Sequence, residues 1–156
     1  DTLLLFASDN GGTERAGGDK GALTDGGTRV PCIVHWRGCR DPGRRTDALV
    51  DFSDLLPTLC AVAGCAPEHV GRGDGQSFAA HLTEGAPAPR SWVFSDWDGE
   101  SFVRERSWKH YSSGRLVATD DAGREIPIEA PAGAALEARE RLARLHADVL
   151  AGRTLT

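Results

Sequence analysis

Asp9 and Asn10 have the residue types and the position for chemistry in this 156-residue sequence. They directly follow an apolar run, residues 3–7, which lacks alternation as a strand buried on both faces of a parallel sheet does. Open α/β sheets bind ligands beyond the carboxyl ends of their strands, so this position favours a site. Two adjacent oxygen-bearing side chains suit Ca²⁺ or Mg²⁺, which take about six or more oxygen ligands. The alternative is that Asn10 and Gly11 form an ordinary turn.

Lys20 is the second candidate, and it lies in the Gly-rich stretch that follows Asn10. Of the 18 basic residues 16 are arginine, so Lys20 and Lys109 are the two lysines of the sequence. An ammonium group beside a cation site can hold an anionic oxygen as a compact point charge. The alternative is an ordinary solvated lysine on a loop.

The elements that must position these residues are predicted from periodicity and turn signals. Residues 30–36 are expected to form a second strand, and a helix is expected to begin at an N-cap, Ser53, and to stop at Gly64. Turn signals then separate four short strands of an antiparallel meander, 92–96, 101–105, 108–111 and 115–118. Apolar residues at helical spacing over 134–150 predict a helix across one face of that meander.

Composition limits the class of partner. With 18 Lys and Arg against 23 Asp and Glu the net charge is −5, which argues against nucleic acid or an anionic membrane surface. No apolar run approaches the roughly 18 to 20 residues of a membrane span. A first strand that needs parallel neighbours leads us to expect the C-terminal part of a longer chain. Alone, these residues are expected to self-associate through that strand.

Several motifs resemble the sulfatase family of the alkaline-phosphatase-like superfamily. They are Ser8-Asp9-Asn10-Gly11-Gly12, Lys20-Gly21, Asp25-Gly26-Gly27-Thr28-Arg29-Val30-Pro31, the helix around Asp54-Leu55-Leu56-Pro57-Thr58-Leu59, and Val103-Arg104 with Trp108-Lys109. The resemblance covers most of residues 1–111. It implies an α/β fold in which residues 1–88 are the C-terminal portion of the catalytic domain. Residues 89–156 would then form a small α+β subdomain, a four-stranded antiparallel sheet with a C-terminal helix.

The resemblance also implies roles for the candidate residues. Asp9 and Asn10 would be two ligands of a catalytic Ca²⁺, with Mg²⁺ as the alternative, and Lys20 would contact an oxygen of the bound sulfate. The family's nucleophile is a formylglycine made from the cysteine of a Cys-x-Pro-x-Arg motif. Cys65-Ala66-Pro67-Glu68-His69 imitates this motif, but it ends in histidine and follows a helix C-terminus, whereas an anionic nucleophile belongs at a helix N-terminus. We therefore expect no catalytic residue in this chain and a formylglycine upstream of residue 1.

The resemblance implies that the whole protein is a sulfuric ester hydrolase acting on a sulfated small molecule or carbohydrate. These residues alone are expected to be inactive, because they carry no nucleophile. Two other functions stay open at this point. One is a phosphonate or phosphate ester hydrolase of the same superfamily, and the other is a non-catalytic module that binds a cation or a carbohydrate.

Overall fold

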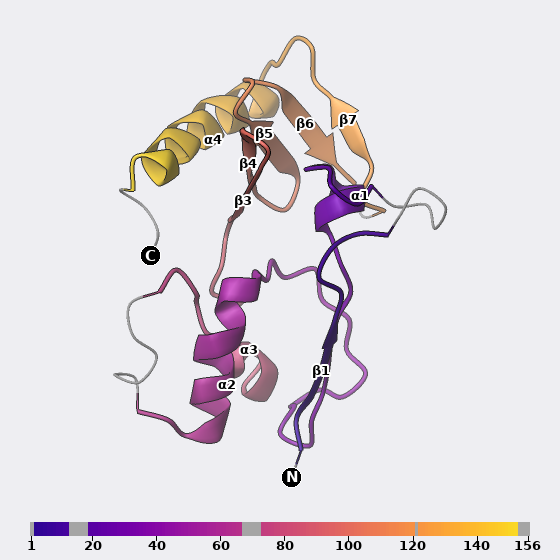
Figure 1. The fold of residues 1–156 in the computed structure, drawn as a ribbon, viewed down its shortest axis with the longest axis vertical. Coiled ribbons are helices and arrows are strands. Elements are labelled where there is room, and N and C mark those ends of the chain that lie inside the picture. Colours follow the sequence, from indigo (N-terminus) through magenta and orange to yellow (C-terminus); the bar gives the residue numbers. More distant parts are fainter. Residues whose placement is uncertain (1, 13–18, 67–72, 121, 153–156) are drawn as a thin grey trace.

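The structure, a computed structural model, describes residues 2–12, 19–66, 73–120 and 122–152. In chain order the elements are β1 (Leu4–Ala7), α1 (Asp25–Thr28), β2 (Cys32–His35), the 3-10 turn η2 (Phe52–Asp54), α2 (Leu55–Ala63), α3 (Ala79–Thr83), β3 (Val93–Trp97), β4 (Glu100–Arg104), β5 (Trp108–Tyr111), β6 (Leu116–Thr119), β7 (Glu125–Pro127) and α4 (Ala134–Leu150). Figure 1 shows β1, α2 and α3 at one end of the molecule and the larger sheet with α4 at the other, with α1 beside that sheet. None of the helices in the described ranges is long and apolar enough to cross a membrane.

β1 and β2 form a two-stranded antiparallel sheet, with Leu4 opposite His35 and Ala7 opposite Cys32. Leu5 and Val34 face α2 and α3 across a small apolar gap. On the opposite face Phe6 is exposed. The expectation of a strand buried on both faces between parallel neighbours is therefore wrong for the described residues. The apolar run supplies side chains for two faces, but only one face has a covering layer here.

The helix expected to begin at Ser53 has a different start. The 3-10 turn η2 precedes the α-helix, and its N-cap is Asp51. The Asp51 carboxylate accepts a hydrogen bond of 2.9 Å from the Ser53 amide, while the Asp54 carboxylate accepts one of 2.8 Å from the Asp51 amide. This reciprocal capping box stabilises η2, and α2 follows it directly. α2 ends as predicted at Gly64, which adopts a left-handed conformation (φ 71°).

The larger sheet is an antiparallel meander in the order β3-β4-β5-β6-β7. The prediction of a meander is confirmed, but the sheet has five strands and not four. The missed strand, β7, has three residues and ends in Pro127, too short for a pattern of alternation. α4 covers one face of this sheet as expected, where Leu142 and Val149 pack against Val103 and Leu116.

The face of the larger sheet opposite α4 binds the segment that leads into α1. Phe102, Tyr111 and Val117 pack there around Leu23, which lies two residues before α1 begins. The strand alternation explains the two cores, because Val103 and Phe102 are neighbours that point to opposite faces. The Gly-rich segment around residue 25 is thus fixed against a sheet that lies far along the chain (Figure 1).

Candidate functional site

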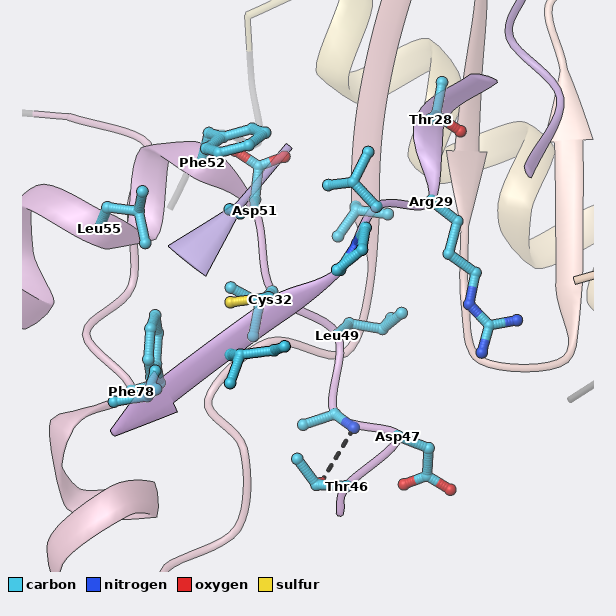
Figure 2. A pocket seen from close by; sticks show the side chains of 18 of the residues that line it. Thr28, Arg29, Cys32, Thr46, Asp47, Leu49, Asp51, Phe52, Leu55 and Phe78 are labelled. Carbon is cyan, nitrogen blue, oxygen red and sulfur yellow. Dashed lines mark hydrogen bonds between the residues drawn. The ribbon is translucent and has the colours of Figure 1, made fainter. Parts of the chain in front are cut away.

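Asp9, Asn10 and Lys20 line one open groove of about 1540 Å³. Further walls come from β2, from residues 41–52 and from β3. Figure 2 shows Cys32 of β2 in the middle of this groove, with Leu55 and Phe78 on one side of it and Leu49 on the other. The structure therefore brings the three predicted site residues to one concave surface.

Two pairs of glycines allow the loops of the site to pack directly on each other. The Gly11 amide donates a 2.8 Å hydrogen bond to the Gly27 carbonyl. A Cβ at Gly11 would lie 1.8 Å from the Gly26 carbonyl oxygen, and one at Gly27 would lie 2.1 Å from that of Ala22. Only glycine permits such an approach, so the Gly-Gly motifs hold the Asp9-Asn10 segment against the start of α1.

Lys20 is held through its backbone, and its side chain makes no ion pair with any residue that the structure describes. The Lys20 amide donates a 2.9 Å hydrogen bond to the Gly12 carbonyl, and the Asp19 amide donates one of 3.3 Å to the Gly26 carbonyl. Asp19 also accepts a hydrogen bond of 2.7 Å from the Thr24 hydroxyl. The exposed Lys20 ammonium has no carboxylate partner among the described residues, so it is available to an anion.

Asp9 and Asn10 offer two oxygen atoms to the groove. The Asn10 side-chain nitrogen donates a 2.9 Å hydrogen bond to the Gly11 carbonyl, which leaves the amide oxygen as the free acceptor. The exposed Asp9 carboxylate makes no hydrogen bond or ion pair with any residue that the structure describes. Two such oxygens fit part of a site for a hard cation. No group of three or more His, Cys, Asp or Glu side chains in the described ranges could hold a metal, so further ligands would come from elsewhere.

A buried charge cluster, which sequence analysis did not predict, lies behind the loops. The Asp25 carboxylate lies 3.1 Å from the Arg104 guanidinium and 3.4 Å from the Lys109 ammonium. Fully buried Lys109 also lies 2.8 Å from the Glu125 carboxylate and donates to the Leu23 carbonyl. Glu125 in turn accepts a 3.0 Å hydrogen bond from the Asp25 amide. Asp25, Arg104, Lys109 and Glu125 are called the charge cluster below.

The hydrogen bond between Lys109 and Glu125 opposes the effect of burial on the pKa of both groups. Burial lowers the pKa of Lys109, but Glu125 and Asp25 oppose that effect. Burial by itself would raise the pKa of Glu125, yet hydrogen bonds from Lys109 and Tyr111 and the Lys109 charge bring it below its ordinary value. The Tyr111 hydroxyl donates to Glu125 at 2.7 Å, and burial together with this carboxylate raises the pKa of Tyr111. The Lys109 ammonium also lies 3.9 Å from the Phe102 ring centroid.

A second buried ion pair lies away from this cluster. The Arg90 guanidinium contacts the Asp54 carboxylate, at 2.9 Å between Nε and Oδ2, and donates to the Asp74 carbonyl at 3.0 Å. Asp54 also accepts a 2.7 Å hydrogen bond from the Gln76 amide. This pair fixes the start of α2 to the segments around residues 74–76 and 90, and it touches neither Asp9, Asn10 nor Lys20.

Cys65 follows the C-terminal end of α2, as sequence analysis predicted. The rest of the imitation motif, Pro67 to His69, lies outside the described residues. All four cysteines are free thiols. Cys65 is therefore placed after a helix C-terminus, where the helix dipole disfavours a developing anion.

The fold and the groove define an α/β protein whose Gly-rich loops present two oxygen-bearing side chains and a lysine with no ion pair among the described residues. Residues 1–65 match the Sulfatase family model. The chain is 35% identical to human arylsulfatase A over 106 residues, which are 60% of this chain and 20% of that protein. It is 30% identical to an arylsulfatase of Hemicentrotus pulcherrimus over 144 residues, 82% of this chain and 26% of that protein. An ulvan-active sulfatase of Formosa agariphila is 32% identical over 78 residues, 49% of this chain and 14% of that protein.

The chain belongs to the sulfatase family. It spans about a quarter or less of the length of these relatives. The family model covers β1, α1, β2 and α2, which include Asp9, Asn10 and Lys20. The three residues that line the groove therefore lie in the part of the chain that matches the family.

Proposed function

We propose that this chain is the C-terminal portion of an alkaline-phosphatase-like sulfatase, and that the whole protein hydrolyses the sulfate ester of a small molecule or carbohydrate. The supporting observation is the packing of the Asp9-Asn10 and Lys20 segments on one Gly-Gly turn, which places Asp9, Asn10 and Lys20 along one groove. In this proposal residues 1–88 complete the catalytic domain and residues 89–156 form the smaller subdomain.

Asp9 and Asn10 hold Ca²⁺ through their side-chain oxygens, and Mg²⁺ is the alternative ion. When bound, the cation supplies positive charge that polarises the sulfate ester. Asn10 is oriented for this role because its nitrogen is engaged by the Gly11 carbonyl. Asp9 supplies one unit of negative charge toward the divalent cation.

Lys20 binds an anionic oxygen of the sulfate group. Its backbone is fixed at Gly12, so the ammonium is held near the groove, while the flexible side chain adjusts to the ester. A compact charge at this place stabilises negative charge on the sulfate oxygens in both ground and transition states.

The nucleophile of the proposed reaction lies upstream of residue 1, as a formylglycine. The sequence contains no Cys-x-Pro-x-Arg motif, and Cys65 remains an ordinary cysteine in this proposal. Peptide mass analysis of the protein, expressed with formylglycine-generating machinery, should show an unmodified thiol at Cys65. An aldehyde at that position would contradict this assignment.

The function is tested with the whole protein on a panel of aryl sulfates, carbohydrate sulfates, phosphate monoesters and phosphonate esters, with Ca²⁺ and after chelation. We expect release of sulfate that chelation abolishes. Turnover of the phosphorus esters alone would indicate the related phosphonate or phosphate hydrolase. Ca²⁺ or carbohydrate binding without turnover of any ester would indicate a non-catalytic binding module.

A further inference from the structure

We propose that Lys109 is a positioning residue that sets the geometry of the loops bearing Asn10 and Lys20, acting through Asp25. This inference rests on the proposed function, because it assigns a role toward the same cation and sulfate site. Lys109 belongs to β5 of the larger sheet and contacts neither Asn10 nor Lys20 itself. Its effect is transmitted through the turn that begins at Asp25.

Lys109 holds the start of α1 at two points. Its ammonium donates to the Leu23 carbonyl and lies 3.4 Å from the Asp25 carboxylate. Glu125, bound to the same ammonium, accepts the Asp25 amide at 3.0 Å. A single buried cation, together with Glu125, thereby fixes the backbone on both sides of Thr24 and the side chain that opens α1.

The residues directly after Asp25 carry the two loops of the site. Gly27 accepts the Gly11 amide through its carbonyl, and Gly26 accepts the Asp19 amide. A Cβ at Gly11 would overlap the Gly26 carbonyl oxygen, so the loop and the turn are in direct backbone contact. A shift at Asp25 must therefore shift the neighbours of Gly11 and Asp19, which are Asn10 and Lys20.

The other charged groups of the cluster cannot easily replace the interactions that Lys109 makes. The Oδ2 atom of Asp25 and the Nε atom of Arg104 already lack hydrogen-bond partners among the described residues. Without Lys109, the buried Asp25 carboxylate and the half-buried Glu125 carboxylate would repel each other, with the arginines Arg104 and Arg29 as the nearby cations that remain. We expect the turn to move outward until water solvates one of them.

The decisive variant is Lys109→Met in the whole protein, since methionine keeps the length of the chain but removes the charge. Arg90→Met is the matched control, because it breaks the other buried ion pair, with Asp54, without touching the site loops. Glu125→Gln is a milder second variant, since its amide oxygen still accepts the Asp25 amide. The measurements are hydrogen exchange at the Gly11 and Lys20 amides, Ca²⁺ affinity by calorimetry, and KM and kcat for an aryl sulfate.

Lys109→Met should accelerate exchange at Gly11 and Lys20 and weaken Ca²⁺ affinity by about 10-fold or more, as loss of a residue that orients a metal ligand does. KM should rise with it, and Glu125→Gln should show the same changes to a smaller degree. Arg90→Met should lower Tm while leaving exchange at both amides and Ca²⁺ affinity within about twofold of wild type.

Unchanged exchange and affinity in Lys109→Met, or equal changes in Arg90→Met, would overturn the proposal. If the wild-type protein bound no Ca²⁺ and cleaved no sulfate ester, the proposed function would fail. Faster amide exchange at Gly11 and Lys20 in Lys109→Met, without such a change in Arg90→Met, would still support the role of Lys109 in positioning the loops.

Discussion

The Lys109 ammonium lies 3.4 Å from the Asp25 carboxylate although 84 positions separate the two residues in the sequence. This contact joins the meander to the Gly-rich loops of the candidate site, so the larger sheet takes part in shaping the groove. Asp25 begins α1, and the Gly11 amide bonds to the Gly27 carbonyl of the same helix. The Lys109–Asp25 contact is therefore connected to Asn10 through the backbone of α1 and Gly11. The larger sheet therefore supports the site from a side that carries no candidate ligand itself.

Lys20→Ala should impair catalysis in the whole protein without affecting folding. The ammonium is exposed and free of ion pairs among the described residues, so its removal costs no native contact. We expect kcat/KM for a sulfate ester to fall by roughly 10²-fold or more, in line with the loss of one charged stabiliser worth about 2.7–4 kcal/mol. Lys20→Arg should recover only part of the loss, since a planar guanidinium does not replace a compact charge. Near-normal kcat/KM in a folded Lys20→Ala protein would identify Lys20 as an ordinary solvated loop residue.

Asp9→Ala should weaken Ca²⁺ binding rather than sulfate binding. Its carboxylate has no partner among the described residues, so the variant should fold like the wild type. Excess Ca²⁺ should restore part of the activity of Asp9→Ala and none of that of Lys20→Ala. Titration of activity against Ca²⁺ concentration measures the difference. A common response of both variants to added Ca²⁺ would contradict the separate roles assigned to them.

Gly11→Ala should destabilise the loops because of direct backbone overlap. The added Cβ would meet the Gly26 carbonyl oxygen at 1.8 Å, so the two segments must separate. Gly73→Ala is the matched control, since nothing lies within 4 Å of a Cβ built there. Thermal unfolding and Ca²⁺ affinity should both be reduced in Gly11→Ala, while Gly73→Ala should behave as the wild type. Equal behaviour of the two variants would show that the loop packing is not needed for the site.

Local sequence signals predicted much of this fold, and each feature that they missed has its own physical reason. The α4 helix and the meander were predictable because their periodicity is contained in short windows. β7 was missed because three residues cannot display alternation, and the cap at Asp51 was missed because Ser53 is also a common N-cap residue.

Sequence analysis indicated the candidate residues that line the groove but not the charge cluster behind the loops. Asp9, Asn10 and Lys20 stand next to sequence signals, a strand end and glycines. Asp25 also precedes two glycines, but neither Asp25 nor Glu125 carries a signal for the charge cluster, because the partner of both is Lys109, which lies 84 positions from Asp25 and 16 from Glu125. The rarity of lysine in this sequence was a clue for Lys109, but its two carboxylate partners become visible only when the strands are paired.

The isolated 156-residue chain should self-associate through the exposed face of β1 and β2. Phe6 and Ile33 are cross-strand partners on this face, with 59% and 58% of their surfaces exposed. Both outer edges of the two-stranded sheet are also free of strand partners among the described residues. Sedimentation should show dimers or larger species, and Phe6→Ser with Ile33→Ser should reduce them. Leu150→Ser, which changes an equally exposed residue on α4, should not, and a strictly monomeric wild-type chain would contradict the expectation.

Stability should fall as the pH is lowered through the range in which histidine titrates, because two histidines are buried where α4 packs on the larger sheet. The Ser101 hydroxyl lies 2.8 Å from His146 Nε2, and His146 Nδ1 lies 3.3 Å from His110 Nδ1. Burial lowers the pKa of both rings, and the charges of His146 and Arg139 lower that of His110 further. The unfolded state therefore binds more protons than the folded state below about pH 6.5, so stability is complete above that pH and declines beneath it.

The measurement is thermal unfolding of the protein at pH 7.5 and at pH 5.5, with Tm expected to be lower at the acidic pH. His146→Gln should weaken this dependence, because the amide can still bond to Ser101 but no longer takes up a proton. His35→Gln is the control, since His35 is exposed on β2 and should leave the pH dependence as it is. If His146→Gln and wild type lost the same stability between the two pH values, the decline would belong to other groups, and the two buried rings would not be its source.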